Sequence, residues 1–368
     1  MNMLKKYADL LVDYCLDLKK GEKLYISSST LAEPLIREVY RKATAVGAYT
    51  EVDLSFREQS NIFFAEADDD LLKEIPVFKE KALSTFDAYL NIRAPHNLME
   101  NQSVDPAKKK IRQAALKKLN DIYFTRTGDG SMKRSLCQYP TQANAQKAGM
   151  SLEEYESFIH NACGLHTDDP VSHWLEVRRK QQKLVDLLNT ASDIRYINDK
   201  SDISFSVKGR TWINSDGRTN MPSGEVFSGP VENSVNGTIH FHYPSVFMGS
   251  DVEGITLEVK DGEIVKWSAE KGGDVLDQVF QIDGARHFGE VAIGTNYNIQ
   301  RPTKNILFDE KIGGTIHMAV GQSYKQTGGL NQSTIHWDMI SDMRNGGRIV
   351  VDGEEIYQDG FFLNGLLD

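Results

Sequence analysis

The spacing of apolar residues changes about halfway along the chain. In the first half, short apolar segments alternate with stretches whose apolar residues recur every three or four positions. The first pattern is typical of strands and the second of amphipathic helices. We therefore predict strands at 22–28, 49–55, 88–94 and 121–127, with helices at 31–48 and 107–120. This βαβ order predicts a mainly parallel sheet.

The middle of the chain is predicted to be helical, and the second half to consist of short strands. Ser151 and Glu154 have the spacing of a capping box, and Asp169 followed by Pro170 is typical of a helix start. From about Asp193, short strands alternate with Gly, Asn-Gly and Asp-Gly turns. We predict an α/β N-terminal domain at 1–190 and an α+β, strand-rich catalytic domain at 191–368.

Charge and cysteine content narrow the range of partners and compartments. The formal net charge is −10, whereas a nucleic-acid binder needs clustered Lys and Arg, so no nucleic-acid partner is expected. The three cysteines form no CxxC motif, which favours a reducing cytoplasm. Lys5, Lys6 and Asp9 interrupt the first apolar stretch, and no other stretch is apolar enough to cross a bilayer. We therefore expect a cytoplasmic protein with no membrane partner.

The segment TIHWDMI, residues 334–340, has an unusual pair of polar residues. If it is a strand, Ile335, Trp337 and Met339 lie on one face, and His336 and Asp338 lie on the other. An imidazole and a carboxylate so close to a buried surface need to pair or to bind a metal.

Three further segments of the second half place chemically active residues among glycines. Together with TIHWDMI, they supply two imidazoles and three carboxylates without a thiolate, a usual ligand set for one or two divalent transition metals. The imidazole content argues against magnesium or calcium. The candidate residues are Glu225 (NMPSGEVF), Glu290 (HFGEVAIGTN), His317 and Tyr324 (GTIHMAVGQSY), and His336 and Asp338.

Each of these residues also has a simpler interpretation. A glutamate that follows a glycine is usually a solvated turn residue, and a strand histidine is more often hydrogen-bonded in a core than bound to metal. In the strand pattern, however, Glu290 shares its face with Ala292 and Gly294, and His317 shares its face with Ala319. These small neighbours leave room for a shared pocket.

Other motifs are weaker candidates. His240 and His242 have ligand spacing but no Gly-flanked carboxylate beside them, so we expect an exposed or edge pair. In the cluster at 163–174, Asp169 is better explained as a helix cap. No GxSxG, GxGxxG or Walker motif occurs, so the sequence gives no case for a nucleophilic serine and none for a bound dinucleotide or nucleoside triphosphate.

Over nearly its whole length the chain resembles the aminopeptidase T/aminopeptidase S family of two-metal exopeptidases. The resemblance includes YPTQANAQKAGMSLEEYESF and DPVSHW in the first half. The second half adds GRTWINSDGRTNMPSGEVFSGP, GEVAIGTN, HMAVGQSY and HWDMI. The order and spacing of these segments are specific, although each is short.

The resemblance implies a function and a set of site residues. Glu225, Glu290, His317, His336 and Asp338 match the family's metal ligands, and Tyr324 matches its active-site tyrosine. It further implies two divalent ions, with zinc or cobalt expected and magnesium or manganese as alternatives, and a homodimer that cleaves short peptides. In this mechanism the ions activate a water, Tyr324 hydrogen-bonds the oxyanion, and Glu225 or Glu290 is the general base.

Two departures from the family pattern concern the entrance to the site rather than its ligands. The segment KQTGGLNQSTI between Tyr324 and His336 is short, and Ser223 stands where many members have Asp. From the residues alone, two other classes remain open. One is a different two-metal hydrolase such as an amidase or phosphatase, and the other is a non-catalytic metal-dependent peptide-binding protein.

Overall fold

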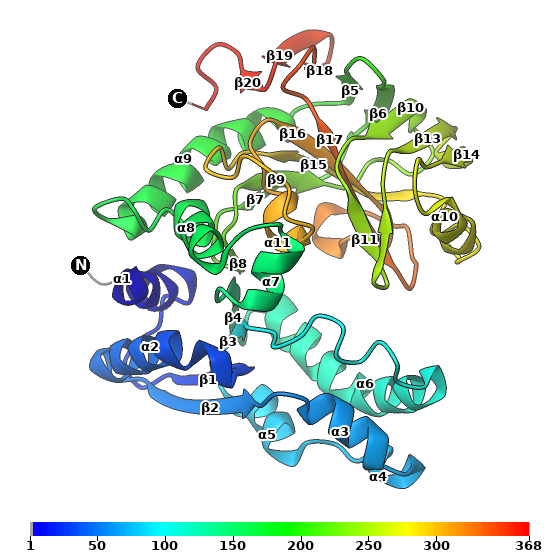
Figure 1. Cartoon of the computed structure of the whole chain (residues 1–368). Coiled ribbons are helices and arrows are strands. Elements are labelled where there is room, and N and C mark those ends of the chain that lie inside the picture. The colour runs from blue at the N-terminus through cyan, green and yellow to red at the C-terminus, as the bar shows by residue number, and fades with distance from the viewer. Residues whose placement is uncertain (1–2, 368) are drawn as a thin grey trace. The chain divides into compact units, whose positions relative to one another are not determined.

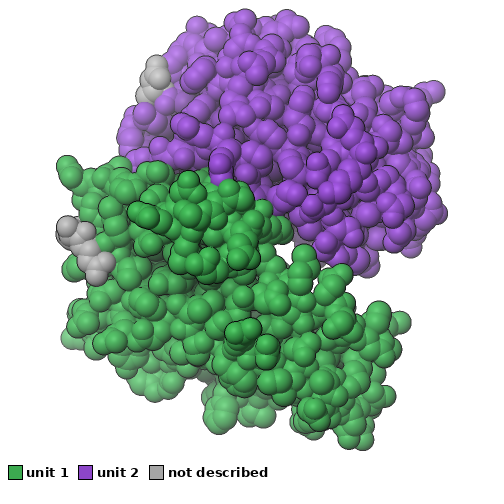
Figure 2. All heavy atoms as spheres, viewed as in Figure 1, with its two compact units in different colours: residues 1–171, 217–221 green, residues 172–216, 222–368 purple. Residues whose placement is uncertain are grey.

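The computed structural model describes residues 3–367 and divides into two compact units, coloured separately in Figure 2. Unit 1 takes the chain up to Val171 together with Gly217–Met221, and unit 2 takes Ser172–Asp216 and the chain from Pro222 onward. Helix α9 (Pro170–Leu188) therefore lies almost wholly in unit 2. The predicted domain division after residue 190 stays a prediction.

Unit 1 is built on a parallel sheet with strand order β2-β1-β3-β4-β8 (blue to cyan, with β8 in green, in Figure 1). All its strand pairs are parallel, as the βαβ pattern predicts. The strands are β1 Lys23–Ser29, β2 Tyr49–Ser55, β3 Ala88–Arg93, β4 Lys133–Gln138 and β8 Asn220–Met221.

The helices of unit 1 follow local sequence signals. Gly47 ends α2 in the left-handed conformation, at φ 89°, and Ser151 and Glu154 form the predicted capping box of α8. The helices are α1 Met3–Asp9, continued by the π-helix Leu10–Cys15, the 3-10 turn Thr30–Ala32, α2 Glu33–Val46, α3 Gln59–Glu66, α4 Asp69–Lys73, α5 Val77–Thr85, α6 Pro106–Gly128, α7 Gln142–Lys147 and α8 Leu152–Ala162.

One predicted strand is wrong. Residues 121–127 form the end of α6, and the next strand of the sheet is β4. The run of Ile122, Tyr123 and Phe124 suggested a strand, but Leu119 and Tyr123 have helical spacing and pack with Tyr89 in one apolar cluster. The helical period of α6 continues through the half-buried Tyr123, whereas Phe124 is exposed.

Unit 2 is the strand-rich part of the chain. Its larger sheet has strand order β14-β13-β10-β6-β5-β18-β19-β20, its smaller sheet has order β17-β16-β15-β9-β7, and β11 and β12 form a hairpin. All strand pairs within unit 2 are antiparallel. The fold class predicted from the sequence, a parallel α/β part followed by a strand-rich α+β part, is therefore confirmed.

The elements of unit 2 surround a continuous apolar core that contains Trp212, Phe288, Met318 and Met339. The strands are β5 Asp193–Ile197, β6 Asp202–Ser206, β7 Ile213–Ser215, β9 Glu225–Ser228, β10 Asn236–Phe241, β11 Ser245–Phe247, β12 Ser250–Val252, β13 Ile255–Lys260, β14 Glu263–Ser268, β15 Phe288–Gly294, β16 Thr315–Gly321, β17 His336–Asp342, β18 Arg348–Val351, β19 Glu354–Gln358 and β20 Phe361–Phe362. With α9, the helices are α10 Gly273–Val279, α11 Ile306–Asp309 and the 3-10 turn Lys325–Thr327.

No helix in the described range 3–367 is both long enough and apolar enough to cross a bilayer.

Candidate metal centre

The smaller sheet of unit 2 carries the candidate ligands in neighbouring rows. Glu290 on β15 pairs with Ala319 on β16, and Ala319 pairs with Asp338 on β17. In the next row, Ala292 pairs with His317. Because directly paired residues of adjacent strands lie on the same face, these side chains project from one surface of the sheet.

Small residues and a bulge shape this face. Glu225, at the start of β9, pairs with Gly294, so no side chain lies between it and β15. The register of β15 shifts between Phe288 and Glu290, and a Cβ on Gly289 would lie 2.4 Å from the carbonyl oxygen of Gly321. A bulge of this kind redirects the side chain that follows it, which here is Glu290.

His317 lies at the centre of the cluster and is fully buried. Its Nε2 is 3.1 Å from Oε1 of Glu290 and 3.3 Å from Oε2 of Glu225. Both glutamates are 5% exposed, so neither is the solvated turn residue that a glycine neighbour usually indicates.

His336 and Asp338 complete the group predicted from the sequence. His336 Nε2 is 3.4 Å from Oδ1 of Asp338 and 3.7 Å from Oε2 of Glu290. Its Nδ1 lies 2.8 Å from the carbonyl oxygen of Gln322. This backbone contact orients the ring so that Nε2 points toward the carboxylates, a usual arrangement for a metal-binding histidine.

Glu225 is fixed from behind by helix α9. The buried Gln181 donates hydrogen bonds from Nε2 to the backbone oxygens of Glu225 and Ser215, both 3.1 Å away. Thr295 in turn donates to Gln181 Oε1 over 3.0 Å. The amide therefore joins three segments beside the centre and keeps the start of β9 in place.

The sequence analysis missed Glu310 and Lys311, which follow α11. Lys311 is buried, and its Nζ forms short ion pairs with the carboxylates of Glu225 and Glu310. The available signal was the segment FDEKIGG, an acidic and a basic residue directly before a Gly-Gly turn and the His317 strand. The alternation of faces along a strand does not apply to residues in a loop. The sequence pattern therefore could not show that Glu310 and Lys311 lie beside the sheet.

The donor atoms of this cluster fit a divalent cation. Within residues 3–367, ligand atoms of Glu225, Glu310 and His317 lie within 4.8 Å of one another, and so do those of Glu290, His317 and Asp338. Three buried atoms of the cluster have no hydrogen-bond partner among the described residues: Glu225 Oε2, His317 Nδ1 and Asp338 Oδ1. Buried polar atoms are rarely left unsatisfied, and unfilled carboxylate oxygens next to imidazole are the donor set of a transition metal.

The pKa shifts have an electrostatic cause that agrees with this interpretation. Burial raises the pKa of Glu290, and it raises the pKa of Glu310 to about 8. Burial alone would lower the pKa of His317 and His336, but the carboxylates beside them raise these values to about 9 and about 10. For Lys311, burial is likewise outweighed by Glu225 and Glu310, which raise its pKa. The carboxylates thus attract protons onto the buried imidazoles, and a divalent cation bound among these carboxylates would take the place of those protons.

Tyr324 lies at the edge of the same cluster. Its ring centroid is 5.0 Å from that of His336 and 5.7 Å from that of Phe227, and the residue is 44% exposed. Burial of the phenol and the carboxylates of Glu290 and Asp338 raise the pKa of Tyr324 well above its usual range. The hydroxyl therefore keeps its proton at neutral pH and is a hydrogen-bond donor.

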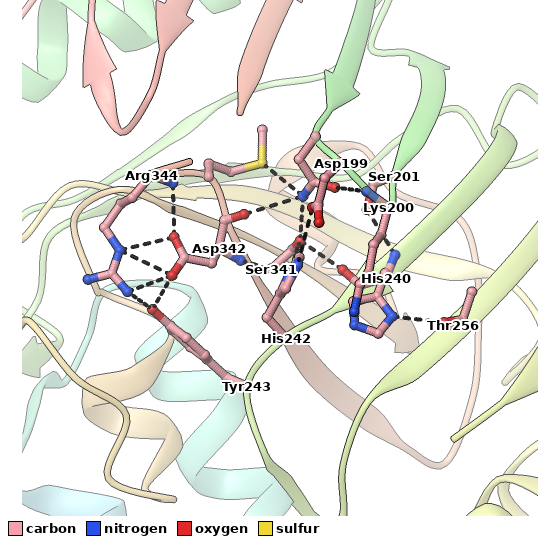
Figure 3. Close-up of polar contacts among 12 residues, drawn as sticks. Asp199, Lys200, Ser201, His240, His242, Tyr243, Thr256, Ser341, Asp342 and Arg344 are labelled. Atoms are coloured by element: carbon pink, nitrogen blue, oxygen red, sulfur yellow. Dashed lines mark hydrogen bonds and ion pairs between the residues drawn. The ribbon is translucent and has the colours of Figure 1, made fainter. Parts of the chain in front are cut away.

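His240 and His242 form a separate polar network (Figure 3). Nδ1 of His240 is 2.8 Å from the Thr256 hydroxyl, and Nδ1 of His242 is 3.2 Å from the Ser341 hydroxyl. The expectation of an exposed or edge pair is wrong for His240, which is 6% exposed on β10, between β13 and β6. The Thr256 hydroxyl explains this burial because it satisfies the imidazole without a charge.

The fold and this centre define a metal-binding protein with the donor set of a transition-metal hydrolase. A family model described as thermophilic metalloprotease (M29) matches residues 1–362, and the chain belongs to this family. The predicted family resemblance and the predicted enzyme class, a metallopeptidase, are therefore confirmed.

Named relatives cover nearly the whole chain. It is 28% identical to Aminopeptidase 2 of Geobacillus stearothermophilus, with 97% of each chain covered. It is 27% identical to Aminopeptidase PepS of Streptococcus thermophilus, with 97% of this chain and 95% of the relative covered. The solved structure of wild-type AmpT from Thermus thermophilus matches with a TM-score of 0.85 at 23% identity, covering 98% of this chain and 99% of that one. This structural match shows that the two proteins share a fold.

Proposed function

We propose that the chain is an aminopeptidase that uses two divalent metal ions to remove N-terminal residues from short peptides. The observation that carries this proposal is the convergence of buried carboxylates and imidazoles with unfilled bonds on one sheet face of an M29 metalloprotease. The relatives named aminopeptidases support the exopeptidase activity. The proposed ligands are Glu225, Glu290, His317, His336 and Asp338, with Glu310 as an addition from the geometry.

The side chains of the centre have different proposed roles in peptide hydrolysis. Bound ions lower the pKa of a water and polarise the scissile carbonyl. Glu225 or Glu290 accepts the proton of the attacking water, whichever keeps a free oxygen, and later passes it to the leaving amine. Tyr324 donates a hydrogen bond to the oxyanion that develops on the carbonyl oxygen, a contact that strengthens in the transition state.

The ligand chemistry favours zinc or cobalt as the ion. Imidazole together with carboxylate suits these metals, whereas magnesium prefers oxygen ligands and keeps several waters. Manganese accepts the same carboxylates and is the alternative with the nearest chemistry. Metal analysis of the protein purified from its own cells identifies the ion that is used there.

We further propose a homodimer in the cytoplasm. Cys15, Cys137 and Cys163 are free and buried, as expected for a chain kept in a reducing compartment. Phe78 and Phe124 of unit 1 are 91% and 68% exposed, and such apolar side chains are candidates for a contact with a second copy. Light scattering of the purified protein measures the mass: a dimer supports this assembly, and a monomer contradicts it.

The activity is tested with a pair of substrates. Metal-stripped protein is given a leucyl chromogenic amide or its N-acetyl analogue, with and without added zinc or cobalt. An aminopeptidase cleaves only the free-amine substrate, and only with metal. Cleavage of both substrates instead identifies a broader amidase. Bound metal and bound peptide without turnover identify a non-catalytic binding protein.

A further inference from the structure

Lys311 makes the two candidate ligand groups unequal. Its side chain is 1% exposed, and its Nζ pairs with Oε1 of Glu225 and Oε1 of Glu310. Both carboxylates belong to the group Glu225, Glu310 and His317. The other group, Glu290, His317 and Asp338, contains neither of them. In the group that contains Glu225 and Glu310, one oxygen of each glutamate thus already pairs with an ammonium of the chain, while Oε2 of Glu225 stays open.

The ammonium of Lys311 changes the charge balance of the centre once metal ions bind. Glu225, Glu290, Glu310 and Asp338 together supply four carboxylates, and two divalent ions neutralise them completely. Lys311 is then a surplus positive charge in a buried place. Repulsion between buried charges is weakly screened, so the ammonium opposes the ion that lies nearest to it.

The atoms that Lys311 contacts are a second reason why an ion binds less well at Glu225 and Glu310. A metal ion needs the lone pairs of the carboxylate oxygens, and the Lys311 ammonium already uses one oxygen of Glu225 and one of Glu310. An ion that binds both residues through these oxygens has to displace Nζ. The position formed by Glu290, His317 and Asp338 requires no such displacement.

We propose that Lys311 sets unequal affinities for the two ions of the centre. The first ion binds tightly at Glu290, His317 and Asp338. The second ion binds weakly at Glu225 and Glu310 because it competes with the ammonium for their oxygens. This inference rests on the proposed function of a two-ion peptidase and assigns Lys311 a positioning role that regulates how fully the centre is loaded.

The test is a metal titration of the full-length, metal-free protein. Mn²⁺ is added, and free Mn²⁺ is followed by electron paramagnetic resonance, which reports binding without any measurement of activity. We expect two binding steps in the wild type, separated by at least ~10-fold in Kd. Lys311→Met removes the competing charge and tightens the second step by at least ~10-fold.

Two matched variants distinguish an effect of the Lys311 charge on metal binding from an effect of a disturbed fold. Lys311→Arg keeps the positive charge and should keep the steps apart. Lys304→Met removes a lysine of the same unit whose Nζ pairs with Asp251 at 2.8 Å instead, and it should titrate as the wild type does. A wild type that binds one Mn²⁺ while Lys311→Met binds two also supports the proposal.

Several results would overturn it. Two equally tight steps in the wild type contradict the proposal even if Lys311→Met does not fold. An unchanged or weaker second step in a folded Lys311→Met protein does the same. Failure of the wild type to bind any Mn²⁺, Zn²⁺ or Co²⁺ would instead overturn the proposed function, so the two failures are distinguishable.

Discussion

Two clusters of unit 2 are built around pairs of histidines, and they differ in what surrounds the imidazoles. In the candidate metal centre, His317 and His336 face buried carboxylates. In the second network, Nδ1 of His240 and of His242 face the hydroxyls of Thr256 and Ser341, and the carboxylate near His242 is that of the exposed Asp199, at 3.7 Å. His336 and Asp338 have the same two-residue spacing as His240 and His242, so spacing by itself does not distinguish the clusters.

The difference lies in charge and in unfilled bonds. In the network of Figure 3, hydroxyls pair with Nδ1 of both imidazoles, and the carboxylate of Asp199 is exposed to water. In the metal centre, carboxylates crowd together, and the buried atoms Oε2 of Glu225 and Oδ1 of Asp338 lack hydrogen bonds among the described residues. Burying such groups without a partner costs free energy that a cation recovers. Crowded carboxylates, more than histidines, mark the place where an ion binds.

The largest effect is expected from a substitution of the histidine that both ligand groups share. His317→Ala should lose bound metal and at least ~10³-fold in kcat/KM, because the ions supply several kcal/mol of transition-state stabilisation. Metal analysis and peptide hydrolysis measure the two effects. His240→Ala is the matched control and should keep its metal. If His317→Ala retained full metal content, the assignment of the centre would fail.

The next effect separates metal binding from catalysis within the centre. Tyr324→Phe should lower kcat by ~10²-fold and leave the metal content unchanged, because the hydroxyl acts on the oxyanion. Steady-state kinetics and metal analysis are compared with Tyr49→Phe, a change at an exposed tyrosine of unit 1. A drop in metal content with Tyr324→Phe would give the tyrosine a structural role instead.

Metal removal should affect the two clusters differently. With the ion at ~100 times its Kd, binding to the folded state adds ~2.7 kcal/mol to the free energy of unfolding, and a chelator removes it. Urea denaturation with and without chelator measures this change. The stability of His317→Ala should not respond to the chelator, whereas that of His240→Ala should respond fully.

Disrupting the histidine pair should cost stability only. The double variant His240→Ala/His242→Ala loses hydrogen bonds to Thr256 and Ser341, and we expect a loss of ~1–3 kcal/mol in the free energy of unfolding. The value of kcat/KM should stay within ~2-fold of the wild type because the proposed metal ligands lie outside these contacts. A loss of bound metal in this variant would move the ion site to the pair.

The smallest effect is a pH dependence of stability. Burial lowers the pKa of His240 below 6.5, assisted by His242 and Lys200 and opposed by Glu270 and Asp199. The unfolded chain therefore binds the proton at a higher pH, and stability is lost as the pH falls below 6.5 toward the folded pKa. Urea denaturation at pH 8 and pH 5 should show a larger decrease for the wild type than for His240→Asn. Equal decreases would contradict the effect of burial.

Local signals in the sequence predict local structure and part of the centre. The cap of α8 and the strands that carry Glu290, His317 and Asp338 could be predicted because residues within a few positions determine them. The ligands could be proposed as one set for two reasons. Carboxylates and imidazoles are usual ligands of a divalent transition metal, and the segments that carry them resemble those of the aminopeptidase T/aminopeptidase S family. That all six candidate residues lie together is a finding of the structure.

Features that depend on distant partners could not be predicted. The segment at the end of α6 resembles a strand because Ile122, Tyr123 and Phe124 are consecutive, whereas only the half-buried Ile122 and Tyr123 pack on the apolar cluster of unit 1. Glu310 and Lys311 lie in a loop, where no periodicity indicates direction, and their role depends on Glu225 far along the chain. The burial of His240 depends in the same way on Thr256 of the neighbouring strand.

The most direct test of the central claim is an anomalous-diffraction map from crystals grown with zinc or cobalt. The account predicts strong peaks bounded by Glu225, Glu290, His317, His336 and Asp338, and no peak at His240 and His242. Peaks at the histidine pair, with none between the carboxylates of the smaller sheet, would contradict it.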